Sequence, residues 1–274
     1  MTEQPRVDIV IPVYNSLHLV RRCVESVARH TDFELDRLTI IDDGSDAHTA
    51  AFLDRFAAGH GARLLRNDRN IGFVRTCNRA WQAAEAPYVL LLNSDTLVTP
   101  GWLNKMVRAM ESDPAIGIAS PISNFAPHMQ IDMVPGLDYL AMSEAVERLS
   151  PREYPDITTT EGFCYLIRAT CLADIGYFDA VFDDGYGEES DQSMRANAAG
   201  WRTVCVDDTY IYHHGRGTFG DESRAALYER NKEIFFDRWK DDYARDYGDM
   251  NDRQPLGTLH RRLDELRRHT PAVG

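Results

Sequence analysis

The chain has 274 residues, of which 43% are hydrophobic and 27% charged, and its formal net charge is −13. This length and balance predict one large folded domain with appendages, and they exclude extended disorder and low-complexity sequence. No apolar run reaches the 18 residues of a membrane-spanning helix. An acidic chain also lacks the positive surface that non-specific nucleic-acid binding needs. We therefore expect a globular protein with no nucleic-acid partner and no transmembrane segment.

The first 120 residues alternate between short apolar runs and helical patterns. Apolar runs predict strands at 7–13, 38–41, 62–65, 88–92 and 116–120, and helical spacing predicts helices at 16–30, 47–58, 73–84 and 100–112. Strands that alternate with helices favour an α/β fold with a parallel sheet covered on both faces. Ser16 is the expected N-cap of the first helix, and Asp42 that of the second.

The pattern changes after residue 120. Residues 121–137 contain three prolines and predict a long, exposed or lid-like loop. The elements expected beyond it are a helix at 142–149, a strand at 157–168, a helix at 188–199, a strand at 202–206, and helices at 221–248 and 258–269. The last two helices predict a helical C-terminal extension.

The cysteines and the N-terminus indicate the compartment. Cys23, Cys77, Cys164, Cys171 and Cys205 form no CxxC pair, which predicts reduced thiols packed inside a cytosolic protein. The first 15 residues lack the basic head and apolar run of a secretory signal. A cytoplasmic location is the expectation.

Several nucleotide-binding motifs are missing. The first predicted strand is followed by neither GxGxxG nor GxxxxGK[ST], which argues against a dinucleotide-binding dehydrogenase and a P-loop NTPase. Instead, three predicted strands end in polar clusters at Tyr14-Asn15, Asp42-Asp43-Gly44-Ser45 and Asn93-Ser94-Asp95. These are turn-forming residues. They also stand where open α/β sheets bind ligands, outside the carboxyl ends of the strands.

Further polar motifs extend this series along the chain. They are Pro12-Val13-Tyr14-Asn15, Asp42-Asp43-Gly44-Ser45, Asn70-Ile71-Gly72-Phe73 with Asn78, Asn93-Ser94-Asp95, Glu188-Glu189-Ser190-Asp191 with Arg195 and Gly200-Trp201, and His213-His214 with Gly217. In this order, over residues 6–220, the set resembles glycosyltransferase family 2, the inverting enzymes with a GT-A fold. The resemblance implies a Rossmann-like, mostly parallel central sheet flanked by helices.

The resemblance implies a site for a nucleoside-diphosphate sugar. Asp43 would contact the nucleobase or ribose, and the pocket would include Pro12, Val13, Tyr14, Asn15, Asn70, Gly72, Asn93 and Ser94. Asp95 would hold a divalent cation, Mn²⁺ or Mg²⁺, together with His213 or His214, of which we favour His213. Asn93 stands where the family's DxD motif has its first carboxylate. Arg75 or Arg79 would either face the diphosphate or lie on a solvated helix face.

The same resemblance implies the catalytic and acceptor residues. Glu189 matches the position of the general base that accepts the proton of the acceptor hydroxyl. Glu188 and Asp191 are further catalytic candidates, although carboxylates at a helix start also stabilise the helix through its dipole. Glu161 and Gly162 would contact the acceptor.

Together these assignments predict three parts and one reaction. Residues 1–120 would form the nucleotide-sugar-binding half, 121–220 the acceptor half with the base, and 221–274 the helical extension. The acceptor would be a saccharide or a lipid-linked saccharide in polysaccharide or cell-envelope assembly, which is compatible with peripheral association at the inner face of the membrane. The alternatives are a non-catalytic sugar-nucleotide-binding protein and a sugar nucleotidyltransferase. The latter would want a Gly-rich, basic phosphate loop, and residues 12–18 contain no Gly, Lys or Arg.

Overall fold

A seven-stranded sheet forms the centre of the protein. The computed structural model describes residues 6–215 and 221–269, without the side chains of 221–224. The strands are β1 (Val7–Val13), β2 (Arg37–Asp42), β3 (Arg63–Arg66), β4 (Tyr88–Leu92), β6 (Ile116–Ile122), β7 (Cys164–Arg168) and β8 (Arg202–Tyr210), in the spatial order β3-β2-β1-β4-β7-β6-β8. β7 runs antiparallel to both of its neighbours, and the other pairs are parallel. The predicted mostly parallel sheet is confirmed.

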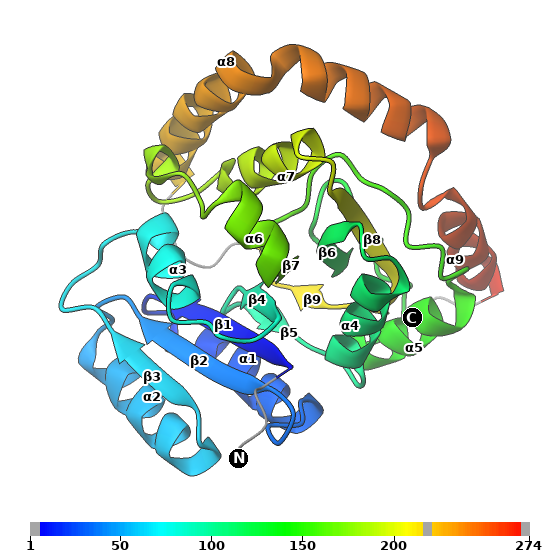
Figure 1. Cartoon of the computed structure of the whole chain (residues 1–274). Helices are drawn as coiled ribbons and strands as arrows, with labels where there is room; N and C mark the ends of the chain where they lie inside the picture. The colour runs from blue at the N-terminus through cyan, green and yellow to red at the C-terminus, as the bar shows by residue number, and fades with distance from the viewer. Residues whose placement is uncertain (1–5, 216–220, 270–274) are drawn as a thin grey trace.

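Helices cover the sheet on both faces (Figure 1). They are α1 (Leu17–His30), α2 (Ala47–His60), α3 (Phe73–Trp81), α4 (Trp102–Ser112), α5 (Tyr139–Leu149), α6 (Ala169–Ile175), α7 (Glu188–Ala198), α8 (Asp221–Arg253) and α9 (Gly257–His269). A short 3₁₀ helix η1 (Ala180–Phe182) precedes α7, and β5 (Thr96–Leu97) pairs with β9 (Tyr212–His213) in a separate two-stranded sheet. Residue 120, the predicted boundary between the two halves, falls within β6, so both halves contribute strands to one sheet.

The apolar strands are buried on both faces because helices pack on each side. Ile9 and Ile11 of β1 enter the larger core with α1 and α4, whereas Val10 between them packs with Val74 and Cys77 of α3. This alternation is the geometry of a strand, in which successive side chains point to opposite faces.

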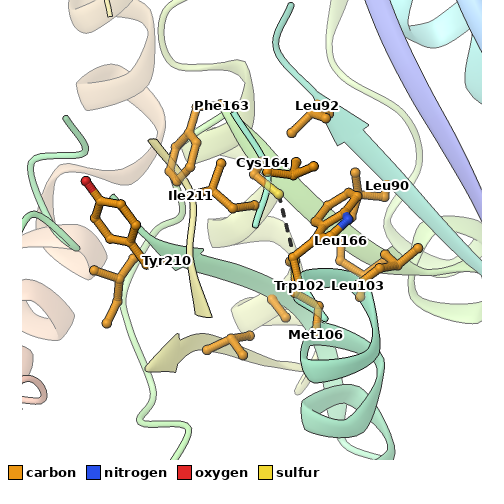
Figure 2. Packing of buried hydrophobic residues seen from close by; sticks show 14 of the residues in the cluster. Leu90, Leu92, Trp102, Leu103, Met106, Phe163, Cys164, Leu166, Tyr210 and Ile211 are labelled. Atoms are coloured by element: carbon orange, nitrogen blue, oxygen red, sulfur yellow. Dashed lines mark hydrogen bonds between the residues drawn. The ribbon is translucent and has the colours of Figure 1, made fainter. Parts of the chain in front are cut away.

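The larger core joins the sheet to α4 (Figure 2). Leu90 and Leu92 of β4, Trp102 and Met106 of α4, and Cys164 and Leu166 of β7 meet there. Cys164 Sγ lies 3.8 Å from Met106 Sδ, and all five cysteines of the chain are buried and free. The prediction of packed, unpaired thiols is confirmed.

The C-terminal extension is helical, as predicted, and packs on the rest of the molecule. α8 arches over the side of the molecule that carries α7, and α9 lies beside α5 (Figure 1). Leu259 and Leu263 of α9 are buried in the larger core. Over the described parts of the chain, no helix has the length and apolarity to cross a membrane.

One of the two predictions about helix caps is wrong. Ser16 is the N-cap residue of α1, as predicted, although it has a φ of 55° and its side chain makes no cap hydrogen bond. Asp46, not Asp42, caps α2, because its carboxylate accepts the N–H groups of His48 and Thr49. Asp42 instead accepts hydrogen bonds from the Ser45 N–H and from Arg66 Nε.

Two predictions about the middle of the chain also need correction. The strand expected at 157–168 begins only at Cys164, because Cys164 pairs with Leu92, the last residue of β4. Glu161 and Gly162 therefore lie in the turn before it. Residues 121–137 are not an exposed lid: β6 continues to Ile122, and the apolar side chains Ala126, Met129, Ile131 and Val134 are buried in the larger core.

We predict that Asp46→Ala lowers the free energy of unfolding by about 1 kcal/mol, since two N–H groups at the start of α2 lose their acceptor. Urea titration measures the change. Asp46→Asn is the matched control, because it keeps a capping side chain and should retain most of the stability. Equal stability of Asp46→Ala and the parent chain would contradict the assignment of the cap.

Candidate active site

A cavity of about 270 Å³ opens at the carboxyl ends of β1, β2 and β4. Most of the predicted nucleotide-binding residues line it: Pro12, Val13, Tyr14, Asp43, Asn70, Gly72, Asn93 and Ser94. The predicted Asp95, His213, Glu161, Gly162, Glu188 and Glu189 line it as well. Residues from seven separate segments thus meet in one place, as the strand-end argument predicts.

Asn15 is the exception among the predicted nucleotide-binding residues. Its N–H donates to Ser45 Oγ at 2.9 Å, and its side-chain oxygen accepts the Asp46 N–H at 2.8 Å. These bonds tie the end of β1 to the loop after β2, and Asn15 is not part of the cavity lining. These hydrogen bonds give Asn15 a structural role, and its predicted contact to the nucleotide stays a prediction.

Asp43 combines a place in the cavity with a structural role. Its Oδ1 accepts hydrogen bonds from Asn67 Nδ2 at 2.7 Å and from the Ile71 N–H at 2.9 Å. The neighbouring Gly44 has a φ of 73°, and a Cβ there would lie 2.6 Å from the backbone carbon of Arg69. Only glycine lets the two segments approach this closely. Asp43 thereby holds the loop that presents Asn70 and Gly72 to the cavity.

The antiparallel pair β5 and β9 brings Asp95 and His213 together. Thr96 pairs with His213, and His213 Nε2 lies 3.3 Å from Asp95 Oδ1. Burial opposes ionisation of Asp95, but the His213 side chain and the Gly215 N–H outweigh it and lower the pKa of Asp95. The site therefore favours the carboxylate form.

The geometry distinguishes the two histidines. The His213 ring stacks on Phe163 at a centroid distance of 5.1 Å, and its Nδ1 lies 2.9 Å from the Phe125 carbonyl oxygen. His214 is exposed and contributes only its backbone N–H, to the Asp95 carbonyl. His213 is thus the imidazole in the cavity. Gly217, the last residue of this motif, lies outside the described residues.

Asn93 presents a buried amide oxygen. Its N–H donates to the Phe163 carbonyl and its own carbonyl accepts the Thr96 hydroxyl, so the backbone is held in place. Oδ1 of its side chain is buried and has no hydrogen-bond partner in the structure. Among the described residues, no group of three or more His, Cys, Asp or Glu side chains is placed to hold a metal ion. Asp95 and His213 are in contact, and Asn93 lines the same cavity.

Three glutamates gather on the other segments of the cavity. A Cβ on Gly162 would lie 3.7 Å from Glu189 Cδ and 3.9 Å from Glu188 Oε1, so the glycine makes room for both carboxyl groups. Glu188 is 4% exposed, and its Oε2 has no hydrogen-bond partner in the structure. Glu161, on the residue before Gly162, completes the group.

Burial raises the pKa of each glutamate, and the Glu189 charge raises the pKa values of Glu161 and Glu188 further. Burial and the Glu189 charge raise the pKa of Glu161 to about 8. Burial and Glu189 raise the pKa of Glu188 well above its ordinary value. Burial also raises the pKa of Glu189, but hydrogen bonds from Glu188 and from the Gly187 N–H act in the opposite direction. Of this pair, Glu189 therefore ionises first while Glu188 keeps its proton.

Asp191 lies outside this cluster. It is 1% exposed, and its carboxylate binds Arg195 Nε at 2.9 Å, Arg238 Nη1 at 3.1 Å and Trp239 Nε1 at 2.9 Å. Arg238 and Trp239 belong to α8, so Asp191 joins the first turn of α7 to the C-terminal helix. It does not line the cavity, and these contacts give it a structural role, while its predicted catalytic role stays a prediction.

Sequence reasoning missed the segment before α7. Asp184, Gly185 and Tyr186 line the cavity, and the backbone here has a positive φ at Asp183 (54°), Tyr186 (69°) and the glycines on either side of Tyr186. The fully buried Asn231 of α8 holds the segment by donating to the carbonyls of Phe182 and Gly185. The glycine-rich stretch was visible in the sequence, but its partner 46 residues away was not.

The described lining of the cavity is strongly acidic. It contains six carboxylates, those of Asp43, Asp95, Asp184, Glu161, Glu188 and Glu189, with the imidazole of His213 and no Lys or Arg. Arg75 is exposed, and Arg79 donates to the Arg66 carbonyl. Neither arginine is in the lining, which argues against the predicted contact with a diphosphate.

Comparison with known proteins places the fold and the family. Superposition gives a TM-score of 0.65 with GalNAc-T7 crystallised with UDP, GalNAc and Mn²⁺, over 96% of this chain and 54% of that one, at 18% identity. A mannosyltransferase from Pyrobaculum calidifontis, in complex with GDP-Man and Mn²⁺, gives 0.68 over 98% of this chain and 77% of that one, at 17% identity. The fold is that of the GT-A glycosyltransferases.

Sequence models point to the same group. The model described as Glycosyl transferase family 2 matches residues 8–135, and that described as Glycosyl transferase family group 2 matches residues 88–231. The chain belongs to glycosyltransferase family 2. It is 25% identical to human polypeptide N-acetylgalactosaminyltransferase 16 over 267 residues, which are 90% of this chain and 47% of that protein. The chain spans less than half the length of the curated relatives it matches first.

We predict that Asp191→Asn lowers the free energy of unfolding by about 2 kcal/mol, because two arginines lose their charged partner. Thermal unfolding measures the loss. Asp242→Asn, which removes an exposed ion pair with Arg245 on α8, is the control and should change stability by less than about 0.5 kcal/mol. An Asp191→Asn protein of normal stability would contradict the structural role.

Proposed function

We propose that the protein transfers a sugar from a nucleoside-diphosphate sugar to a hydroxyl group of a saccharide or lipid-linked saccharide. Family membership and the GT-A fold support the reaction class. The observation that carries the proposal is the content of one cavity: Asp95 with His213, and the pair of buried Glu188 and half-buried Glu189. In this cavity, Asp95 and His213 would lie at the diphosphate of the donor, and the glutamate pair would accept the proton of the acceptor hydroxyl.

The charge of the cavity argues for a divalent cation. A nucleoside diphosphate is anionic, and the described lining offers it six carboxyl groups, ionised in part, and no Lys or Arg. Asp95, His213 Nε2 and the unpartnered Asn93 Oδ1 fit a cation such as Mn²⁺, which accepts oxygen and imidazole ligands. Bound there, the cation would neutralise the diphosphate as it leaves. The Mn²⁺ in the two similar crystal structures supports this assignment.

Glu189 is the proposed general base. The acceptor hydroxyl attacks the anomeric carbon as its proton passes to Glu189, the nucleoside diphosphate leaves from the opposite face, and the configuration at the anomeric carbon is inverted in one step. Glu188 keeps its proton and hydrogen-bonds to Glu189, so it positions the base. A base inside a buried cavity is also shielded from water.

The proposal assigns the parts of the chain as follows. Residues 1–120 bind the donor, 121–220 carry the base and the acceptor contacts of Glu161 and Gly162, and 221–274 form the extension. Polysaccharide or cell-envelope assembly in the cytoplasm, with peripheral attachment at the inner membrane face, is the proposed setting. A non-catalytic sugar-nucleotide-binding protein would not need the buried Glu188–Glu189 pair. A nucleotidyltransferase would release pyrophosphate in place of nucleoside diphosphate.

We predict that Mn²⁺ or Mg²⁺ strengthens the binding of UDP or GDP and that Asp95→Ala abolishes this effect, since a carboxylate ligand is lost. Calorimetry with and without the metal measures both affinities. Asp184→Asn is the matched control, because it removes a cavity carboxylate that is not a proposed ligand and should leave the metal dependence intact. Equal nucleotide affinity in excess EDTA would refute the metal assignment.

We predict that Glu189→Gln lowers kcat by about 100-fold or more while donor affinity changes little, because glutamine keeps the size of the side chain but accepts no proton. Steady-state release of nucleoside diphosphate in the presence of acceptor measures kcat. Glu188→Gln should have a smaller effect, and the shorter Glu189→Asp should retain part of the activity. Parent-like turnover by Glu189→Gln would remove Glu189 from the role of base.

A further inference from the structure

Two tyrosines stand together beside the glutamate cluster. Tyr186 lines the cavity, and its ring lies 6.1 Å from the ring of Tyr228 at an interplanar angle of 82°. Tyr228 belongs to α8 and is 51% exposed. The two rings therefore form a corner that continues from the cavity wall to the surface of the C-terminal helix.

The backbone connects this corner to Glu188. Gly185 precedes Tyr186, and a Cβ on it would lie 3.6 Å from Glu188 Oε1. Tyr186 has a φ of 69°, a conformation that costs free energy for a residue with a Cβ. Asn231, three residues after Tyr228 on α8, holds this conformation through the Gly185 carbonyl. Asn231 of α8 thus fixes the backbone next to Tyr186, and Tyr228 of the same helix packs against the Tyr186 ring.

The chemistry of this corner matches a sugar ring. Tyrosine rings are rigid, have partly negative faces and combine a large apolar surface with a polar hydroxyl, which suits the C–H face of a pyranose. Next to them, the proton of Glu188 is used in its hydrogen bond to Glu189, and the buried Glu188 Oε2, which has no hydrogen-bond partner among the described residues, can accept another hydrogen bond. A sugar hydroxyl group can donate it.

The surrounding charges select among saccharides. Lys232 Nζ lies 5.9 Å from the centroid of the Tyr228 ring, but it also lies 3.4 Å from Glu229 Oε2, which offsets its charge. The cavity lining on this side adds the carboxyl groups of Glu161, Glu188, Glu189 and Asp184 and no Lys or Arg. Arg230 of α8 is also close to Asp184, and it donates hydrogen bonds to the Val181 carbonyl and to Asn231 Oδ1. A uronic acid or a phosphorylated sugar would meet repulsion here, and a neutral sugar would not.

We propose that Tyr186 and Tyr228 form an acceptor subsite on which a neutral pyranose ring packs, with its hydroxyls bound by Glu188 and Glu161. The inference rests on the proposed transfer reaction and specifies its substrate class, because it makes the acceptor end a neutral sugar. Tyr228 makes α8 part of the binding site.

Saturation-transfer NMR on the full chain with Mg²⁺ and UDP or GDP tests the proposal. The probes are methyl glucoside, methyl galactoside and methyl mannoside, with glucuronic acid as the charged counterpart. At least one neutral pyranoside should bind, and glucuronic acid should bind about tenfold more weakly. Tyr228→Ala should weaken the pyranoside by about 2- to 10-fold, whereas Tyr228→Phe should retain it. Tyr177→Ala, which removes a 40% exposed tyrosine outside the cavity lining, is the matched control.

The outcomes separate the two proposals. If UDP or GDP binds but no pyranoside does, or if Tyr228→Ala binds pyranosides like the parent, the subsite is refuted while the donor site stands. Equal affinity for glucuronic acid and the pyranosides would refute the neutral acceptor. If pyranosides bind in a Tyr228-dependent way but neither UDP nor GDP binds, the proposed sugar transfer is refuted, whereas the proposed saccharide-binding site stands. Circular dichroism of each variant confirms that α8 is still folded.

Discussion

The antiparallel pairing of β7 with β4 is the interaction on which the site depends. Leu92, the last residue of β4, pairs with Cys164, the first residue of β7, and the Asn93 N–H then donates to the Phe163 carbonyl just beyond them. This register places the Asn93-Ser94-Asp95 turn next to the Glu161-Gly162 turn. A shift by one residue would turn each side chain of β7 to the opposite face of the sheet and separate the two turns. The donor side and the acceptor side of the cavity lie next to each other because β4 and β7 are paired.

α8 provides a second constraint, from outside the sheet. Asn231 holds the segment before α7, and Arg238 and Trp239 bind Asp191 in its first turn. Glu188 and Glu189 stand between these anchor points. The C-terminal extension therefore helps to define the position of the proposed base, and removing it would expose the segment that carries Tyr186. α8 is therefore one of the elements that hold the candidate site in place.

Acidity gives the cavity its chemical character. Burial and the neighbouring Glu189 charge raise the pKa values of Glu161 and Glu188. The contact with His213 lowers the pKa of Asp95. One end of the cavity thus favours a negative charge that can hold a cation, and the other favours protonated and proton-accepting groups together. The pKa values differ between the two ends of the cavity because the carboxyl groups have different neighbours. The ordinary pKa values of Asp and Glu are nearly the same.

The sequence by itself determined the longer strands and helices of the first 120 residues, the strand-end motifs and the family, because apolar periodicity and turn chemistry are local properties. It did not predict α6, η1, β5 or β9. Its prediction that Asp43, Asn93, Asp95, His213, Glu188 and Glu189 share one site agrees with the cavity. Only the tertiary structure decided that Asn15 and Asp191 form structural hydrogen bonds outside the cavity lining, that Ala126, Met129, Ile131 and Val134 anchor the loop after β6 in the larger core, and that His213 rather than His214 enters the cavity. It also revealed Tyr186, Tyr228 and Asn231. Each of these outcomes depends on a hydrogen-bond or packing partner from a distant segment of the chain. Strand register and helix packing decide which side chain becomes that partner, and no local sequence pattern contains this information.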